Sequence, residues 1–275
     1  MGFQFGAPAV TRRAAATLTA LAGLGLLAGC QGAGSAAAPA TTLSASAVAA
    51  MQGTLPPPSL LTDTVNDILF AGSVQEILTG SVPGGMVSQV GDLSVSSGRQ
   101  VITLRSPAGG GGAGTVTMRV IILLIGKVTY VYGDATGLNR LIGIPENQAG
   151  QAAGQWIAVQ PGEKLGQLDY NAISSGLTLD DLANSVTPTG TLTPTAPGIV
   201  AGQPVRGVQG TDPGGSGPAR LYVTDTDAPL PVTYTAPGGK APFQVSFSHW
   251  GETLHLTAPP DPIPASSVSA ESATA

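Results

Sequence analysis

One run of residues near the middle of the chain constrains the fold more than any other. Residues 115–120 alternate polar and apolar side chains, which is typical of a strand with one buried face. Residues 121–125 are then uniformly apolar, so we expect both faces of this part to be covered. Gly126 and Lys127 predict a tight turn into a second strand, 128–132. The run therefore predicts an antiparallel hairpin inside a larger sheet.

The rest of the chain contains similar strand-like segments separated by glycine and proline. With 39 Gly and 23 Pro, many turns and many short strands are expected. One helix is expected at 61–69, capped by Thr62 or Asp63 and ended by Gly72. Two more are expected after Asp134 and after Thr178, since each of these residues can cap the first turn of the helix that follows it. Further strands are expected at 73–79, 86–96, 100–105, 220–224, 232–235, 243–249 and 253–257, with a linker at 187–204. Short connections favour antiparallel pairing, so the predicted class is α+β, a large antiparallel sheet with a few helices against it.

The charge and cysteine content exclude several classes of function. Charged residues make up 10% of the chain, and the net charge is −5, without basic clusters. This balance argues against a nucleic-acid partner, because such binding needs Lys or Arg to replace counterions. The single cysteine cannot form an internal disulfide or a zinc-finger site. That cysteine, Cys30, therefore requires another explanation.

Cys30 lies at the end of an apolar run that begins after Arg12 and Arg13. A positive start, a short apolar stretch and small residues before a cleavage site are typical of a secretory signal peptide. The run is short for a membrane span, which needs roughly 20 apolar residues. The small residues Ala28 and Gly29 precede the cysteine. A free thiol in a remnant helix is the alternative to a processed N-terminus.

Composition divides the chain into four parts. We expect a signal peptide at 1–29, a flexible tether at 30–46, one folded domain at 47–260 and a disordered tail at 261–275. Removal of both arginines of the signal peptide would make the net charge 9 − 16 = −7.

No residue pattern predicts catalysis. The glycine-rich stretch 109–114 lacks the Lys of a phosphate-binding loop and precedes a strand, so a hairpin loop is the better interpretation. His249 and His255 could flank a hairpin turn and bind a metal, but no carboxylate cluster supports this, and His249 is expected to pack in the core. We predict no enzyme activity, no cofactor and no metal site.

Several motifs together resemble the LolA-like superfamily, specifically bacterial lipoproteins of the LppX and LprG type. These are the lipobox Leu27-Ala28-Gly29-Cys30, the segments 127–134 and 154–159, and the closing run 247–252 followed by Pro259 and Pro260. The lipobox implies acylation of the Cys30 thiol, cleavage before it, and anchoring to the outer face of the cytoplasmic membrane. Two acyl chains would give stable anchoring.

The resemblance also implies a fold and a function. It implies a curved half-barrel sheet with helices on its concave side and, between them, an apolar cavity for acyl chains of lipids or lipoglycans. Met118, Val120 and Ile122 would line it, and Trp156 would be a ligand contact or a packing residue. A helix could instead fill the sheet and leave an ordinary core. We expect a lipid-binding or lipid-transfer lipoprotein; the alternative is a non-catalytic module that binds another envelope protein.

Overall fold

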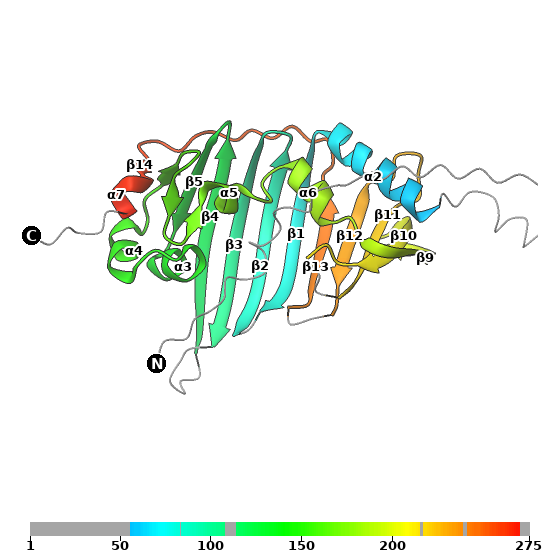
Figure 1. Cartoon of the computed structure of the whole chain (residues 1–275), viewed down its shortest axis with the longest axis horizontal. Coiled ribbons are helices and arrows are strands. Elements are labelled where there is room, and N and C mark those ends of the chain that lie inside the picture. The colour runs from blue at the N-terminus through cyan, green and yellow to red at the C-terminus, as the bar shows by residue number, and fades with distance from the viewer. Residues whose placement is uncertain (1–55, 83, 108–113, 215–216, 239–240, 270–275) are drawn as a thin grey trace, which may run out of the picture.

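The described residues form one large open sheet with helices packed on one face, and a separate sheet of two short strands (Figure 1). The computed structural model describes residues 56–269, except 83, 108–113, 215–216 and 239–240. The sheet has 12 strands in the order β14-β6-β5-β4-β3-β2-β1-β13-β12-β11-β10-β9, and it does not close because β14 and β9 remain as edges. This confirms the predicted α+β class with a large, mostly antiparallel half-barrel sheet.

The elements follow one another in chain order. The helices are α2 (Pro57–Ala71), α3 (Ala135–Gly137), η2 (Leu138–Ile142), α4 (Glu146–Ala152), α5 (Tyr170–Ser174), α6 (Leu179–Ser185) and α7 (Ala265–Ser269). The strands are β1 (Ser73–Val82), β2 (Gly85–Ser94), β3 (Ser97–Pro107), β4 (Thr115–Ile125), β5 (Val128–Gly133), β6 (Ile157–Val159), β7 (Lys164–Leu165), β8 (Leu168–Asp169), β9 (Thr189–Val200), β10 (Gln203–Thr211), β11 (Pro218–Thr224), β12 (Pro231–Ala236), β13 (Phe243–Ser248) and β14 (Ile263–Pro264).

Two series of hairpins meet in the middle of the sheet. Strands β1 to β5 pair antiparallel in chain order, and β9 to β13 do the same. The two series join where β13 pairs antiparallel with β1, the first strand of the described residues. After β13 the chain crosses to the far edge, where β14 pairs with β6 in the parallel direction. The last described segment thus returns to the β5 side of the sheet.

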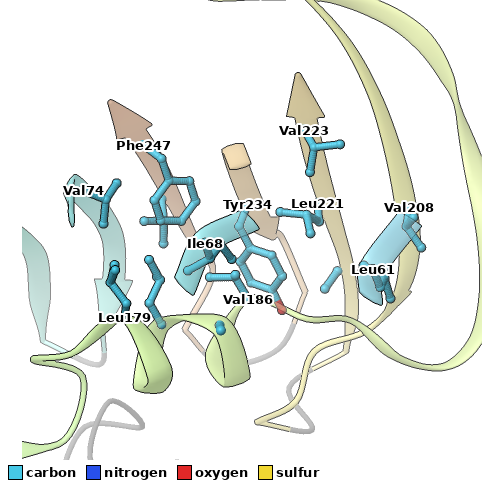
Figure 2. Packing of buried hydrophobic residues seen from close by; sticks show 14 of the residues in the cluster. Leu61, Ile68, Val74, Leu179, Val186, Val208, Leu221, Val223, Tyr234 and Phe247 are labelled. Carbon is cyan, nitrogen blue, oxygen red and sulfur yellow. The ribbon is translucent and has the colours of Figure 1, made fainter. Parts of the chain in front are cut away.

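The helices divide the buried interior into two hydrophobic clusters. In the first cluster, α2 and α6 pack on β1 and on β10 to β13 (Figure 2). Ile68 of α2 and Tyr234 of β12 are completely buried there. In the second cluster, η2, α4, α5 and α7 pack on β4, β5 and β6. Burial of these side chains is the main force that holds the helices to the sheet.

Several sequence predictions are confirmed in detail. The hairpin of β4 and β5 turns at Gly126, which has φ 62°. Asp134 caps α3 by accepting a hydrogen bond from the Gly137 N–H at 2.7 Å. Thr178 caps α6, where its Oγ1 accepts from the Asp181 N–H and donates to the Asp181 carboxylate. These local signals are reliable because each satisfies backbone groups that a turn or helix end leaves unpaired.

The expected double covering of 121–125 is only partly present. Ile122 and Leu124 are buried beneath the helices, and Leu123 is buried on the opposite face. Ile121 and Ile125 are half-buried, so that opposite face is only partly covered.

Three boundaries predicted from the sequence were wrong. Helix α2 begins at Pro57, because proline has the φ of a first helical residue, and Thr62 lies inside the helix. The region predicted as a linker contains β9, which tolerates its prolines because it is the edge strand. Residues 253–257 form no strand; the chain there is extended across the ends of the strands.

The C-terminal region also differs from the expected organisation. We expected a disordered tail from residue 261, whereas β14 and α7 lie between 263 and 269. Ala265 and Val268 are buried in the second cluster, so this segment packs on the domain.

Candidate functional site

The centre of the sheet carries buried polar side chains on the face that the helices cover. On β1, the side chains of Val74, Glu76 and Leu78 alternate onto this covered face. Glu76 on β1 pairs with Gly91 on β2, and Gly91 pairs in turn with Gln100 on β3. These polar positions lie between the two hydrophobic clusters, where an apolar side chain would be expected.

Glu76, Gln89 and Gln100 form a connected group that we call the polar row. They are 6%, 5% and 5% exposed. The Gln89 Nε2 donates to the Glu76 Oε1 at 2.7 Å, and the Gln100 Nε2 lies 3.5 Å from the same oxygen. Glu76 reaches these amides because Gly91 leaves room: a Cβ at Gly91 would lie 2.8 Å from the Glu76 Cγ. The three side chains therefore meet over a glycine, where a larger residue would push the Glu76 side chain aside.

A short loop between α5 and α6 closes the polar row. The Gln100 Nε2 also donates to the Gly176 carbonyl oxygen at 2.6 Å. Leu177 follows and is buried in the second cluster, whereas Leu179 is buried in the first. Between them, Thr178 forms an isolated parallel bridge with Ser94, at the end of β2. The loop 175–178 thus lies across the boundary of the two clusters.

Half-buried apolar side chains continue the covered face beyond the polar row. Val87 on β2 pairs with Leu104 on β3, and Gln89 pairs with Ile102. Val87, Ile102 and Leu104 are each half-buried. Val87 packs against the margin of the first cluster and Ile102 against the margin of the second. We call Val87, Ile102 and Leu104 the apolar strip.

The structure places the predicted cavity residues in two locations. Met118, Val120 and Ile122 share the covered face of β4 and are 0%, 0% and 5% exposed, so they are packed side chains in this structure. Trp156 is half-buried, and its ring lies 5.1 Å from that of Tyr132, on the other face of the sheet. The structure brings the first three together and leaves Trp156 apart from them.

Two open hollows lie away from the polar row. One, of about 410 Å³, is lined by Arg119, Tyr132, Gly133, Asp134, Ala135, Ala153 and Gly154. The other, of about 290 Å³, is lined by Ala71, Gly72, Ser73, Ser94, Gly251, Glu252, Thr253 and Leu254. Neither hollow includes Met118, Val120 or Ile122.

The two histidines lie outside the core, which corrects the prediction for His249. His249 follows β13 with φ 57°, and its side chain is 55% exposed, 3.9 Å from the Glu252 carboxylate. The chain turns before this side chain could continue the inward face of Phe243, Val245 and Phe247. Within the described residues, no group of three or more His, Cys, Asp or Glu side chains is arranged to hold a metal ion.

Other predictions fall on parts of the chain that the structure does not describe. Cys30, the signal peptide and the tether lie there, as do residues 109–113 of the glycine-rich stretch. The strands that flank this stretch, β3 and β4, pair antiparallel up to Pro107 and Thr115. Among residues 56–269, apart from the gaps given above, no helix is sufficiently long and apolar to span a bilayer.

Comparisons with known proteins find similarity only in structure. No family model matches the sequence, and no curated protein matches it. The search of solved structures returns two mycobacterial proteins, LprF and the lipoprotein LppX. LprF from Mycobacterium bovis has a TM-score of 0.48 and 18% identity over 75% of this chain and 99% of its own. LppX from Mycobacterium tuberculosis has a TM-score of 0.39 and 14% identity over 74% and 100%.

A third solved structure, MucB, has a TM-score of 0.35 and 16% identity over 74% of this chain and 64% of its own. The comparison thus returns LppX, one of the lipoproteins that the sequence resembles. Likeness at these levels carries no argument about what this chain binds.

Proposed function

We propose that this protein is a non-catalytic, lipid-anchored lipoprotein that binds an acylated lipid on the covered face of its sheet. The observation that carries the proposal is the apolar strip. Val87, Ile102 and Leu104 are half-buried between two separate hydrophobic clusters, so an acyl chain could cover them without entering either cluster. Each CH₂ removed from water contributes about 0.8 kcal/mol.

The anchor is the second part of the proposal, and it depends on the sequence around Cys30. Acylation of the Cys30 thiol would hold the domain at the outer face of the cytoplasmic membrane. Bound lipid would then be exchanged with that membrane. Met118, Val120 and Ile122 are buried in this structure, so their contact with the acyl chain would require the helices to move away from β4. Trp156 lies outside this path, and we propose a packing role for it against Tyr132.

Lipid binding is tested with the purified full-length Cys30→Ser chain, which the proposal leaves without acyl groups. Native mass spectrometry and lipid extraction should find about one acylated lipid per chain. Leu104→Asp places a charge in the apolar strip and should abolish the bound lipid. Thr103→Asp is the matched control, because Thr103 is the neighbouring residue on the opposite face of β3. A folded protein that is purified empty would favour the alternative, a module that binds another envelope protein.

The anchor is tested by fractionation of cells that produce the full-length chain. Wild type should be found in the membrane fraction, with a mature N-terminus at a modified Cys30. Cys30→Ala should remain unprocessed or leave the membrane fraction, whereas Ser35→Ala, in the same segment, should behave as wild type. An unmodified mature N-terminus at another residue would contradict the anchor.

A further inference from the structure

We propose that the polar row of Glu76, Gln89 and Gln100 binds a hydroxyl group of the acylated ligand, so that the site selects lipids with a hydroxyl-bearing polar group. This inference rests on the proposed function and makes its ligand more specific. The apolar strip and the polar row adjoin on the same strands: Gln89 is two residues from Val87, and Gln100 is two residues from Ile102. Alternate residues of a strand lie about 7 Å apart on one face, so one lipid could contact both.

The polar row is costly to the fold, which is why we assign it a role beyond packing. A buried carboxylate is unfavourable in an apolar environment unless hydrogen bonds compensate for its lost hydration. Replacement of buried polar groups by apolar residues of similar volume is often neutral or stabilising. The surrounding positions show that apolar residues are accommodated here, since Leu78 lies next to Glu76 on β1 and Ile122 next to Gln100 across β4.

The chemistry of the row matches a hydroxyl better than an ammonium group. Glu76 offers carboxylate oxygens that accept hydrogen bonds, whereas the Gln89 and Gln100 Nε2 atoms donate them. A hydroxyl can donate to the carboxylate and accept from an amide at the same time. An ammonium group can only donate, so it would compete with the two amides for the Glu76 carboxylate and offer them no acceptor in return.

Access to the polar row requires displacement of the loop 175–178. The row is closed in this structure, with the Gly176 carbonyl above Gln100 at 2.6 Å. Leu177 belongs to the second cluster and Leu179 to the first, so movement of this loop would open the helical layer at the boundary between the two clusters. An incoming hydroxyl would replace Gly176 as a partner of the Gln100 amide, and the displaced Gly176 carbonyl would accept a hydrogen bond from water instead.

The test compares two probes with the same acyl chain. The full-length Cys30→Ser chain is freed of bound lipid and mixed with equal amounts of 1-palmitoylglycerol, which has hydroxyl groups, and methyl palmitate, which has no donor. Native mass spectrometry then measures the ratio of the two complexes. A hydrogen bond to a charged group corresponds to a preference of about tenfold or more for 1-palmitoylglycerol in the wild-type site.

Three variants assign the preference to Glu76. Glu76→Met removes the carboxylate and should reduce the preference to less than about threefold. Glu76→Gln keeps the side-chain shape, removes the charge and should also lower the preference for 1-palmitoylglycerol. This variant keeps the test valid if Glu76→Met does not fold. Asp92→Asn is the control, because Asp92 lies on the opposite face of β2, beside Gly91, where its carboxylate contacts Gln75 and Arg99. It should leave the preference unchanged.

The outcomes separate this inference from the proposed function. If wild type binds both probes equally, lipid binding stands and the role of the polar row is refuted. If wild type binds neither probe, the proposed function is refuted and this inference with it. If both Glu76 variants keep the wild-type preference, the selecting group lies elsewhere and the inference is overturned.

Discussion

Substitution of Gly98 by alanine tests a close backbone contact between the loop 175–178 and β3. A Cβ at Gly98 would lie 2.0 Å from the Leu177 carbonyl oxygen and 2.9 Å from the Leu177 carbonyl carbon. Real Cβ contacts essentially never fall below 3.0 Å, so the loop 175–178 would have to move by 3.0 − 2.0 = 1.0 Å or more. Both Leu177 atoms belong to the backbone, so no side-chain rotation can relieve the clash.

The expected destabilisation follows from two contributions. Overpacking of a well-packed site costs about 1–3 kcal/mol. Displacement of the loop also breaks the hydrogen bond from Gln100 to the Gly176 carbonyl, which contributes about 1 kcal/mol. We therefore expect Gly98→Ala to lower the free energy of unfolding by about 2–4 kcal/mol. For a domain of this size, the melting temperature should fall by about 5–15 °C.

Thermal unfolding followed by circular dichroism measures this change, with amide hydrogen exchange of 174–178 as a second readout. Gly150→Ala is the matched control: Gly150 lies in α4, and its Cβ would meet nothing within 4 Å. Because alanine favours a helix, the control should be neutral or stabilising by up to about 1 kcal/mol. If Gly98→Ala melts like wild type and its loop exchanges no faster, the described contact between this loop and β3 is wrong.

Two further predictions concern Tyr234 of the first cluster and Asp67 of helix α2. Tyr234→Phe removes the hydrogen bond from the buried Tyr234 hydroxyl to the Asp212 Oδ1 (2.6 Å) and should lower the free energy of unfolding by about 1.5–3 kcal/mol in urea titrations. Tyr222 is half-buried, so the control Tyr222→Phe should change this free energy by less than about 0.5 kcal/mol. Equal effects of the two substitutions would contradict the contribution of the buried hydrogen bond. Burial and, to a smaller extent, the charge of Asp63 raise the pKa of Asp67 above the ordinary aspartate value of 3.8. Folding therefore favours the protonated carboxyl, and the stability that this preference contributes is lost as the pH rises through the raised pKa. Asp67→Asn should therefore raise the melting temperature slightly at pH 7 and lose this advantage below pH 3.8; an equal gain at both pH values would refute the linkage.

The parts of the fold that the sequence predicted are those set by neighbouring residues. The β4 and β5 hairpin, the Asp134 cap and the Thr178 cap each depend on groups a few residues apart. The edge strand β9 was missed because proline and glycine are typical of linkers as well as of edge strands. Only the position of β9 in the sheet distinguishes an edge strand from a linker, and that position depends on pairing with residues far away in the sequence.

The polar row was missed for a related reason. In the run Val74-Gln75-Glu76-Ile77-Leu78, the apolar residues do not alternate regularly, so the sequence does not show which face Glu76 occupies. Gly91 was a usable signal, because a glycine inside a strand indicates close approach of another group. The identity of that group depends on the registers of β1, β2 and β3, which no single segment reveals.

The two borders of the sheet limit how copies of this protein can associate. At one border, β9 contains Pro194 and Pro197, and at the other, β14 consists of Ile263 and Pro264 alone. A neighbouring chain that tried to add a strand there would meet residues without an amide hydrogen, or a segment too short to template growth. Proteins confined to a membrane surface reach high local concentrations, where fibre-like growth through strand addition is a hazard. These proline-bearing borders would let this protein crowd there and remain separate molecules.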